Sequence, residues 1–351
     1  MRCHPPLSKI PSWSHSCAPL CNLNATDGHA KRFHLASETQ GLACGMLKQH
    51  LYLITLVALS SCATMDCESV EKDADFRSSI VEGQFIQLDA GHTYYNYSPG
   101  TGTPLVLVHS FSVPSYQWDH TTDLAIERGL PVISLDLYGR GNSSNPDTTY
   151  TVELFADQVI QLLDHLGIQE KVNLSGISMG GRVISQIASQ QPDRINALIF
   201  VSPAGFADDA ETAGPVAGSA ITEEEIEEFI ETDFPNRAEG QREDFLDKEG
   251  LDGWIDLYRP QLRFKHFARA LLSTNRNARE MSEENKKIGQ QDYPVHFIWG
   301  ADDVVCPLED GRYNALRWIP RAELHVVDAC GHMPHIEKTE VFDRIFFDII
   351  L

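Results

Sequence analysis

One short turn constrains this chain more than any other stretch: residues 176–180 read Gly-Ile-Ser-Met-Gly. The run at 171–175 that precedes it predicts a buried strand, and residues 182–188 have the apolar spacing of a helix. A strand, a G-x-S-x-G turn and a helix place the central Ser178 on a sharp bend, with its hydroxyl clear of the sheet. Gly176 and Gly180 supply the room that such a strained bend needs.

In this context the motif resembles the nucleophile elbow of the α/β-hydrolase family, and the resemblance covers roughly residues 80–351. It implies an α/β fold, with a mostly parallel eight-stranded sheet, helices on both faces and a helical cap inserted into the core. We therefore expect an α/β-hydrolase core over residues 80–206 and 293–351, and a helical cap over residues 207–292. The family orders its catalytic residues Ser, Asp, His along the chain.

Two later motifs match that order. The predicted strand at 294–299 runs into Gly-Ala-Asp-Asp at 300–303, and the family's Gly-x-x-Asp spacing favours Asp303 over Asp302. The Gly-His pair at 331–332 favours His332, with His335 as the weaker candidate. The resemblance implies that Ser178 is the nucleophile, that His332 is the general base and acid, and that Asp303 orients the histidine.

A third motif concerns the oxyanion hole. The buried run at 105–108 ends in His-Ser-Phe, where the family usually has His-Gly-x. The resemblance implies that the backbone amides of Phe111 and Met179 stabilise the oxyanion. It also implies that His109 orders the loop. Ser110 replaces the usual glycine, either as a tolerated variant, which we favour, or as an added polar contact near the pocket.

These motifs resemble most closely the serine carboxylesterases and monoacylglycerol-lipase-like enzymes (EC 3.1.1). The implied function is cleavage of carboxylic esters through an acyl-enzyme. One alternative is a carbon–carbon bond hydrolase of ring-cleavage products, although those enzymes typically have tryptophan where this chain has Met333. Another is a non-catalytic, lipid-anchored binding protein. We expect no cofactor, because no metal-ligand spacing or phosphate-binding loop appears in the sequence.

The charge of the chain limits its partners. The formal net charge is -22, which argues against nucleic acid, because phosphate binding requires clustered Lys and Arg. The expected partner is a small-molecule or lipid ester.

The N-terminal residues differ from the rest of the chain. Residues 1–45 lack helical or strand periodicity and predict an unstructured upstream extension. Residues 46–61 combine a basic start, a short apolar run and small residues, and they resemble a bacterial lipoprotein signal peptide that ends before Cys62. The resemblance implies lipidation of Cys62, a tether over residues 62–79 and anchoring in the bacterial cell envelope, at the outer membrane or periplasm. The alternative is a cytoplasmic protein.

Two cysteines lie beside the expected catalytic pair. Cys306 follows Asp303 by three residues, and Cys330 precedes His332 by two. Because the strands before them should be neighbours, their loops should meet. The sequence leaves two alternatives open. One is a disulfide that braces the expected catalytic pair in an oxidising compartment, and the other is two free buried thiols.

Overall fold

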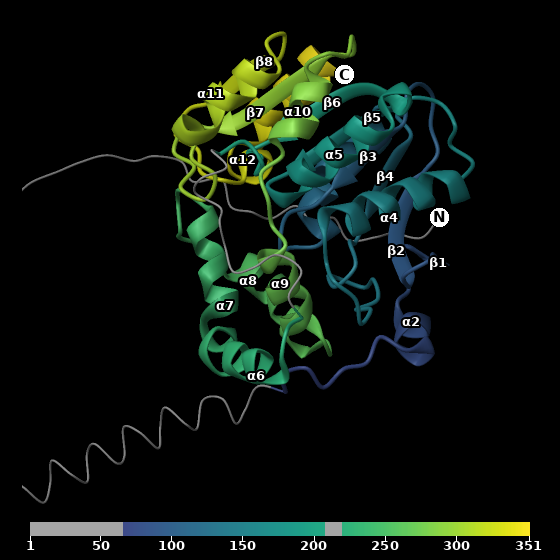
Figure 1. Cartoon of the computed structure of the whole chain (residues 1–351), viewed down its shortest axis with the longest axis vertical. Coiled ribbons are helices and arrows are strands. Elements are labelled where there is room, and N and C mark those ends of the chain that lie inside the picture. The colour runs from purple at the N-terminus through teal and green to yellow at the C-terminus, as the bar shows by residue number, and fades with distance from the viewer. Residues whose placement is uncertain (1–65, 208–219) are drawn as a thin grey trace, which may run out of the picture. The chain divides into compact units, whose positions relative to one another are not determined.

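The computed structural model describes residues 66–207 and 220–351, and these build an eight-stranded sheet at the centre of the fold (Figure 1). The strand order is β1-β2-β4-β3-β5-β6-β7-β8. The first two strands join antiparallel and all later neighbours are parallel. The strands are β1 (Gln84–Gln87), β2 (His92–Ser98), β3 (Leu105–Val108), β4 (Val132–Leu135), β5 (Val172–Ile177), β6 (Ile195–Val201), β7 (Val295–Gly300) and β8 (Glu323–Val327). The predicted fold class is confirmed.

Helices cover both faces of the sheet, which is why β3, β4, β5 and β7 are buried along their whole length. On one face lie α4 (Val152–His165), α5 (Met179–Gln190), α10 (Ser282–Ile288) and α11 (Leu308–Trp318), whose apolar side chains share one core cluster. On the other face lie α3 (Asp119–Glu127), α13 (Thr339–Asp343) and the π-helical turn η6 (Arg344–Ile350). The short α12 (Pro334–Glu337) precedes α13.

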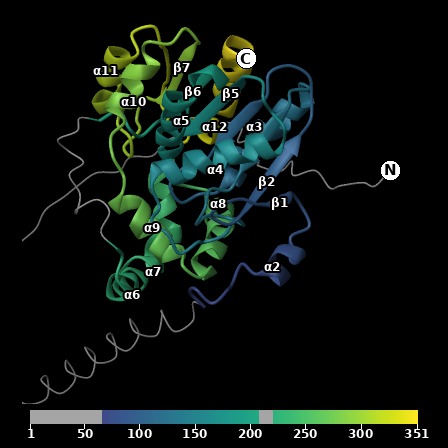
Figure 2. The ribbon, with the colours of Figure 1, turned by 45° about the vertical axis from the view of Figure 1, so that its right-hand side comes forward.

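The cap has an apolar core of its own. It contains α6 (Glu223–Thr232), α7 (Phe234–Gly240), α8 (Asp252–Tyr258) and α9 (Phe267–Arg276), together with the 3-10 turns η4 (Gln241–Asp244) and η5 (Arg259–Arg263). Phe234, Tyr258 and Phe267 are fully buried at its centre. Figures 1 and 2 both show these four helices gathered at one end of the sheet.

The cap is shorter than the expected 207–292. Helix α10 falls inside that range, yet its Ile288 is buried in the same core cluster as α5. The Ser185 hydroxyl on α5 donates a 2.8 Å hydrogen bond to Asn285 of α10. Because its apolar side packs on α5, α10 belongs to the hydrolase core, and the core resumes before residue 293.

Residues 66–79 correct the expectation of a free tether over 62–79. The Glu68 carboxylate accepts the amides of His266 (3.1 Å) and Ala268 (2.6 Å) at the start of α9. The Lys72 ammonium donates to the Ser143 carbonyl at 2.7 Å. This segment, which includes the short helix α2 (Ala74–Ser79), is therefore held on the cap and the core. The expected extension, signal peptide and Cys62 lie outside the described residues.

Candidate active site

The turn after β5 has the strained geometry that a nucleophile elbow requires. Ser178 adopts φ 53° and ψ -120°, a backbone conformation that costs a non-glycine residue about 1–3 kcal/mol. A Cβ on Gly176 would lie 2.4 Å from the Gly180 carbonyl oxygen, and one on Gly180 would lie 2.6 Å from the Val108 carbonyl oxygen. At both positions the neighbouring backbone comes so close that only glycine fits. Helix α5 begins directly after the serine.

An aspartate and a histidine form a buried pair at the ends of the next strands. The Nδ1 atom of His332 lies 2.8 Å from Oδ2 of Asp303, and both side chains are almost fully buried. The other carboxylate oxygen of Asp303 accepts the amides of Val305 and Cys306, each at 2.9 Å. These bonds fix the carboxylate so that Nδ1 of His332 donates to it, which leaves Nε2 to exchange a proton.

The structure also places the weaker candidates. Asp302 is exposed, whereas Asp303 is buried against His332. The ring of His335 packs 4.6 Å from that of Trp118, measured between centroids, and burial lowers the pKa of His335 to about 3. His335 is therefore a neutral core residue, and the pair that forms is His332 with Asp303.

Parallel topology brings the serine to the same edge of the sheet. Ser178 follows β5, Asp303 follows β7 and His332 follows β8, so all three leave the carboxyl ends of parallel strands. The Cys306 thiol lies beside the Ser178 hydroxyl, and among the described residues no hydrogen bond joins that hydroxyl to His332. Catalytic hydrogen bonds often form only when substrate is bound.

The loop after β3 is ordered by a neutral histidine. His109 donates through Nδ1 to the Ser110 carbonyl at 2.7 Å and accepts the Leu137 amide through Nε2 at 2.8 Å. Burial lowers the pKa of His109 to about 3. Ser110 has no left-handed φ, so the serine found in place of glycine is accommodated without backbone strain.

The two expected oxyanion donors lie beside one pocket. Among the described residues, no acceptor is found for the backbone amides of Phe111 and Met179. Both residues line a small cavity of about 50 Å³ between the core and the cap segment at 274–279. The Phe111 carbonyl accepts a 2.7 Å bond from Nε of the buried Arg140, which anchors the loop. Two amides without protein acceptors at a pocket wall form an arrangement that can receive a developing oxyanion.

Cys306 and Cys330 are free thiols, which is the second of the two alternatives that the sequence left open. Cys330 packs in the core cluster under α13, whereas Cys306 packs against the cluster under α5, on the opposite face of the sheet. Burial raises the pKa of each thiol to about 12, so both are protonated at neutral pH. Cys306 instead touches Ser178 and Asp303, a contact that no sequence motif indicates.

The cap contributes an acidic residue to this site that sequence reasoning missed. The carbonyl of Asp244, at the end of η4, accepts the His332 amide at 2.9 Å. Burial raises the pKa of the Asp244 carboxyl to about 6, although the charge of His332 opposes this shift. Asp244 belongs to no recognisable motif, and only the fold of the cap brings it here.

The pKa of His332 is raised by this acidic surrounding. Burial alone would lower it, but the hydrogen bond and charge of Asp303, with smaller contributions from Asp244 and Glu337, outweigh burial. A general base must be neutral, so activity should appear only as the pH rises through this elevated pKa.

This predicts the effect of Asp244→Asn on the pH profile of kcat/KM. Removing the Asp244 charge lowers the pKa of His332, so the midpoint of the acid limb should move to lower pH. The matched control is Glu243→Gln, which changes the exposed neighbouring carboxylate paired with Lys248 and should leave the midpoint in place. Equal profiles for Asp244→Asn and the unmodified chain would contradict the assignment.

Among the described residues, no helix is long and apolar enough to cross a membrane. Comparison with known proteins found relatives that are named for different activities. A dihydrolipoyllysine-residue acetyltransferase component of the acetoin cleaving system from Pseudomonas putida is 31% identical over 256 residues, which are 68% of this chain and 61% of that relative. The chain therefore spans about three fifths of that relative's length.

Two further comparisons cover nearly the whole of shorter proteins. A 2-hydroxy-6-oxononadienedioate/2-hydroxy-6-oxononatrienedioate hydrolase from Comamonas testosteroni is 26% identical, over 72% of this chain and 88% of its own. The structure of a thermophilic esterase from Thermogutta terrifontis superposes with a TM-score of 0.60 at 23% identity, covering 74% of this chain and 95% of that one. The model of the alpha/beta hydrolase fold family matches residues 103–286, and the chain belongs to this family.

Proposed function

We propose that this protein is a serine hydrolase that cleaves carboxylic esters through an acyl-enzyme, with Ser178, His332 and Asp303 as its catalytic triad. The single observation that carries the proposal is the buried 2.8 Å contact between His332 and Asp303, at the sheet edge that also presents the strained Ser178.

The mechanism follows from the protons that the serine and the histidine donate and accept. The Ser178 oxygen attacks the ester carbonyl carbon while its proton passes to Nε2 of His332, and Asp303 stabilises the imidazolium that forms. The oxygen that becomes negative accepts hydrogen bonds from the Phe111 and Met179 amides, and losing one such donor typically costs about 3–4 kcal/mol. His332 then protonates the departing alcohol. Water attacks the acyl-enzyme with His332 as base, and the acid and free serine are released.

The charges around the pocket favour a neutral ester. Two of the residues that line it, Arg182 and Arg279, are already paired with acids, Arg182 with Glu280 at 3.2 Å and Arg279 with Glu153 at 2.9 Å. Phe155, Val152 and Val183 make much of the remaining wall apolar. With its cations compensated and Asp244 close to His332, the site offers little attraction to a substrate with several negative charges.

The alternative is a carbon–carbon bond hydrolase, which one comparison favours. The relative from Comamonas testosteroni is named for dioate substrates, which are dicarboxylates. The same serine, histidine and aspartate are available for that chemistry, so the difference lies in the pocket. The paired state of Arg182 and Arg279 is our reason for placing ester hydrolysis first.

The test is hydrolysis of p-nitrophenyl esters from acetyl to palmitoyl by the full chain and by Ser178→Ala. We expect turnover that falls at least about 10³-fold in the variant, because the nucleophile is lost while the oxyanion donors remain. The chain-length optimum then separates an esterase from a lipase.

A vinylogous 2-hydroxy-6-oxo dicarboxylate is assayed beside the esters as the competing substrate. Cleavage of this compound with no ester turnover would replace the ester proposal by the carbon–carbon hydrolase. If Ser178→Ala kept the activity of the unmodified chain, a serine mechanism would be contradicted. If the unmodified chain turned over none of the compounds, a binding protein would be favoured.

We also propose that the protein is anchored in the bacterial cell envelope through lipid on Cys62. Residue 66, the first described residue, lies four residues further on, so an extended chain would allow at most roughly 14 Å between them. Since residues 66–79 are held on the cap, an anchor at Cys62 would keep the cap close to the membrane surface. Intact-mass measurement of protein from a bacterial envelope should give a chain that begins at Cys62 with added acyl groups. An unmodified chain beginning at Met1 would overturn the proposal.

A further inference from the structure

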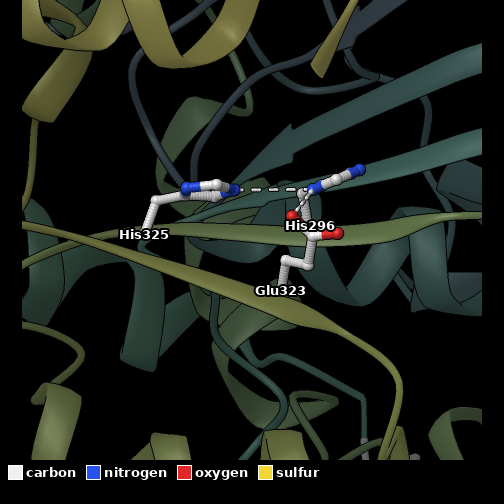
Figure 3. A group of neighbouring side chains, drawn as sticks. All are labelled: His296, Glu323 and His325. Carbon is white, nitrogen blue, oxygen red and sulfur yellow. Dashed lines mark hydrogen bonds and ion pairs between the residues drawn. The ribbon is translucent and has the colours of Figure 1, made fainter. Parts of the chain in front are cut away.

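Two histidines and a glutamate meet on one face of the sheet, away from the triad. His296 is the second residue of β7, and Glu323 and His325 are the first and third residues of β8. In the register of these parallel strands, Glu323 lies beside His296, and His325 lies beside Ile298. Alternate residues of a strand point to the same face, so all three side chains project to one side. Figure 3 shows them directed toward one another.

The distances between their polar atoms suit a metal ion. Nδ1 of His296 lies 3.5 Å from Nε2 of His325 and 3.8 Å from Oε2 of Glu323. One ligand atom from each residue can be chosen so that all three lie within 4.8 Å of one another. Ligands about 2.0–2.1 Å from a tetrahedral zinc ion are separated by roughly 3.3 Å, so shifts of less than about 1 Å per side chain would complete the geometry.

We propose that His296, Glu323 and His325 bind a divalent transition-metal ion of the zinc class. Imidazole nitrogens and a carboxylate oxygen form a ligand set that suits Zn²⁺, and three protein ligands leave a fourth position for water. The partly exposed position of the group on the edge strand β8 gives the ion a route in from solvent, because Glu323 is 65% exposed while His296 is 10% exposed.

The surroundings keep the ligands in the right protonation state. Burial lowers the pKa of His296 and of His325, against the attraction of Glu323, so both imidazoles are neutral at neutral pH. Metal binding requires neutral imidazole. With one carboxylate and two neutral rings, the group carries a single negative charge that a divalent cation would reverse.

The site is separate from the catalytic centre. His296 and Glu323 lie at the amino ends of β7 and β8, whereas Asp303 and His332 follow the carboxyl ends of the same strands. A bound ion would join the edge strand β8 to its neighbour, and these two strands carry the loops that hold Asp303 and His332. Its role is therefore structural, with no part in the hydrolytic steps.

The test is calorimetric titration of chelator-treated full chain with ZnCl₂, together with its thermal unfolding. We expect one ion bound per chain with a raised unfolding temperature, because a ligand that binds only the folded state stabilises it. In His325→Ala and in Glu323→Gln the affinity should fall by at least about tenfold. These positions are at the sheet edge, and circular dichroism verifies that each variant is folded.

The matched control is His165→Ala, an exposed histidine at the end of α4, which should bind zinc like the unmodified chain. Cysteines and the histidines before residue 62 also offer metal ligands, so Co²⁺ is used as a spectroscopic probe. Binding at the proposed site gives ligand-field bands without thiolate charge transfer, and these bands disappear in His325→Ala. Equal affinity in all variants, thiolate bands that persist in His325→Ala, or no zinc binding would each overturn the proposal.

Discussion

The strained backbone of Ser178 is the constraint on which the rest of the site depends. Its amide donates to the Val201 carbonyl at 3.1 Å, and its carbonyl accepts the Gly181 amide at 2.8 Å and the Ala204 amide at 3.0 Å. Two of these partners belong to β6 and the loop after it, so the neighbouring strand holds the turn in its unfavourable conformation. The sheet thus stabilises a geometry that the local sequence would not keep.

Burial of the acidic groups around His332 gives the site its electrostatic character. Asp303 is buried, and hydrogen bonds from two backbone amides and from His332 hold its carboxylate against Nδ1. Asp244 comes from the cap and adds to the same field. The cap therefore affects the pKa of His332, the histidine of the proposed triad, and its turn that ends at Asp244 is hydrogen-bonded to the backbone of His332.

Most of the core could be predicted from the sequence, since its signals are local. The run at 105–108 is a strand with those bounds, and the Gly-x-x-Asp and Gly-His spacings favoured Asp303 and His332, the pair that forms. Asp244 could not be predicted, because its place depends on how the cap folds. The cluster of His296, Glu323 and His325 depends on the register of two strands, which spacing along the chain does not reveal. The sequence could not decide between a disulfide and two free thiols, because neighbouring loops can direct their cysteines to opposite faces of a sheet.

The most direct test of the triad is the rate at which a fluorophosphonate labels the protein, with the modified peptide identified by mass spectrometry. We predict rapid labelling of Ser178 in the unmodified chain and in Asp302→Asn, which changes the exposed neighbour. Asp303→Asn should label slower by orders of magnitude, up to roughly 10⁴-fold, because His332 would no longer be held in the tautomer that accepts the serine proton. Labelling at another residue, or equal rates in Asp302→Asn and Asp303→Asn, would contradict the account.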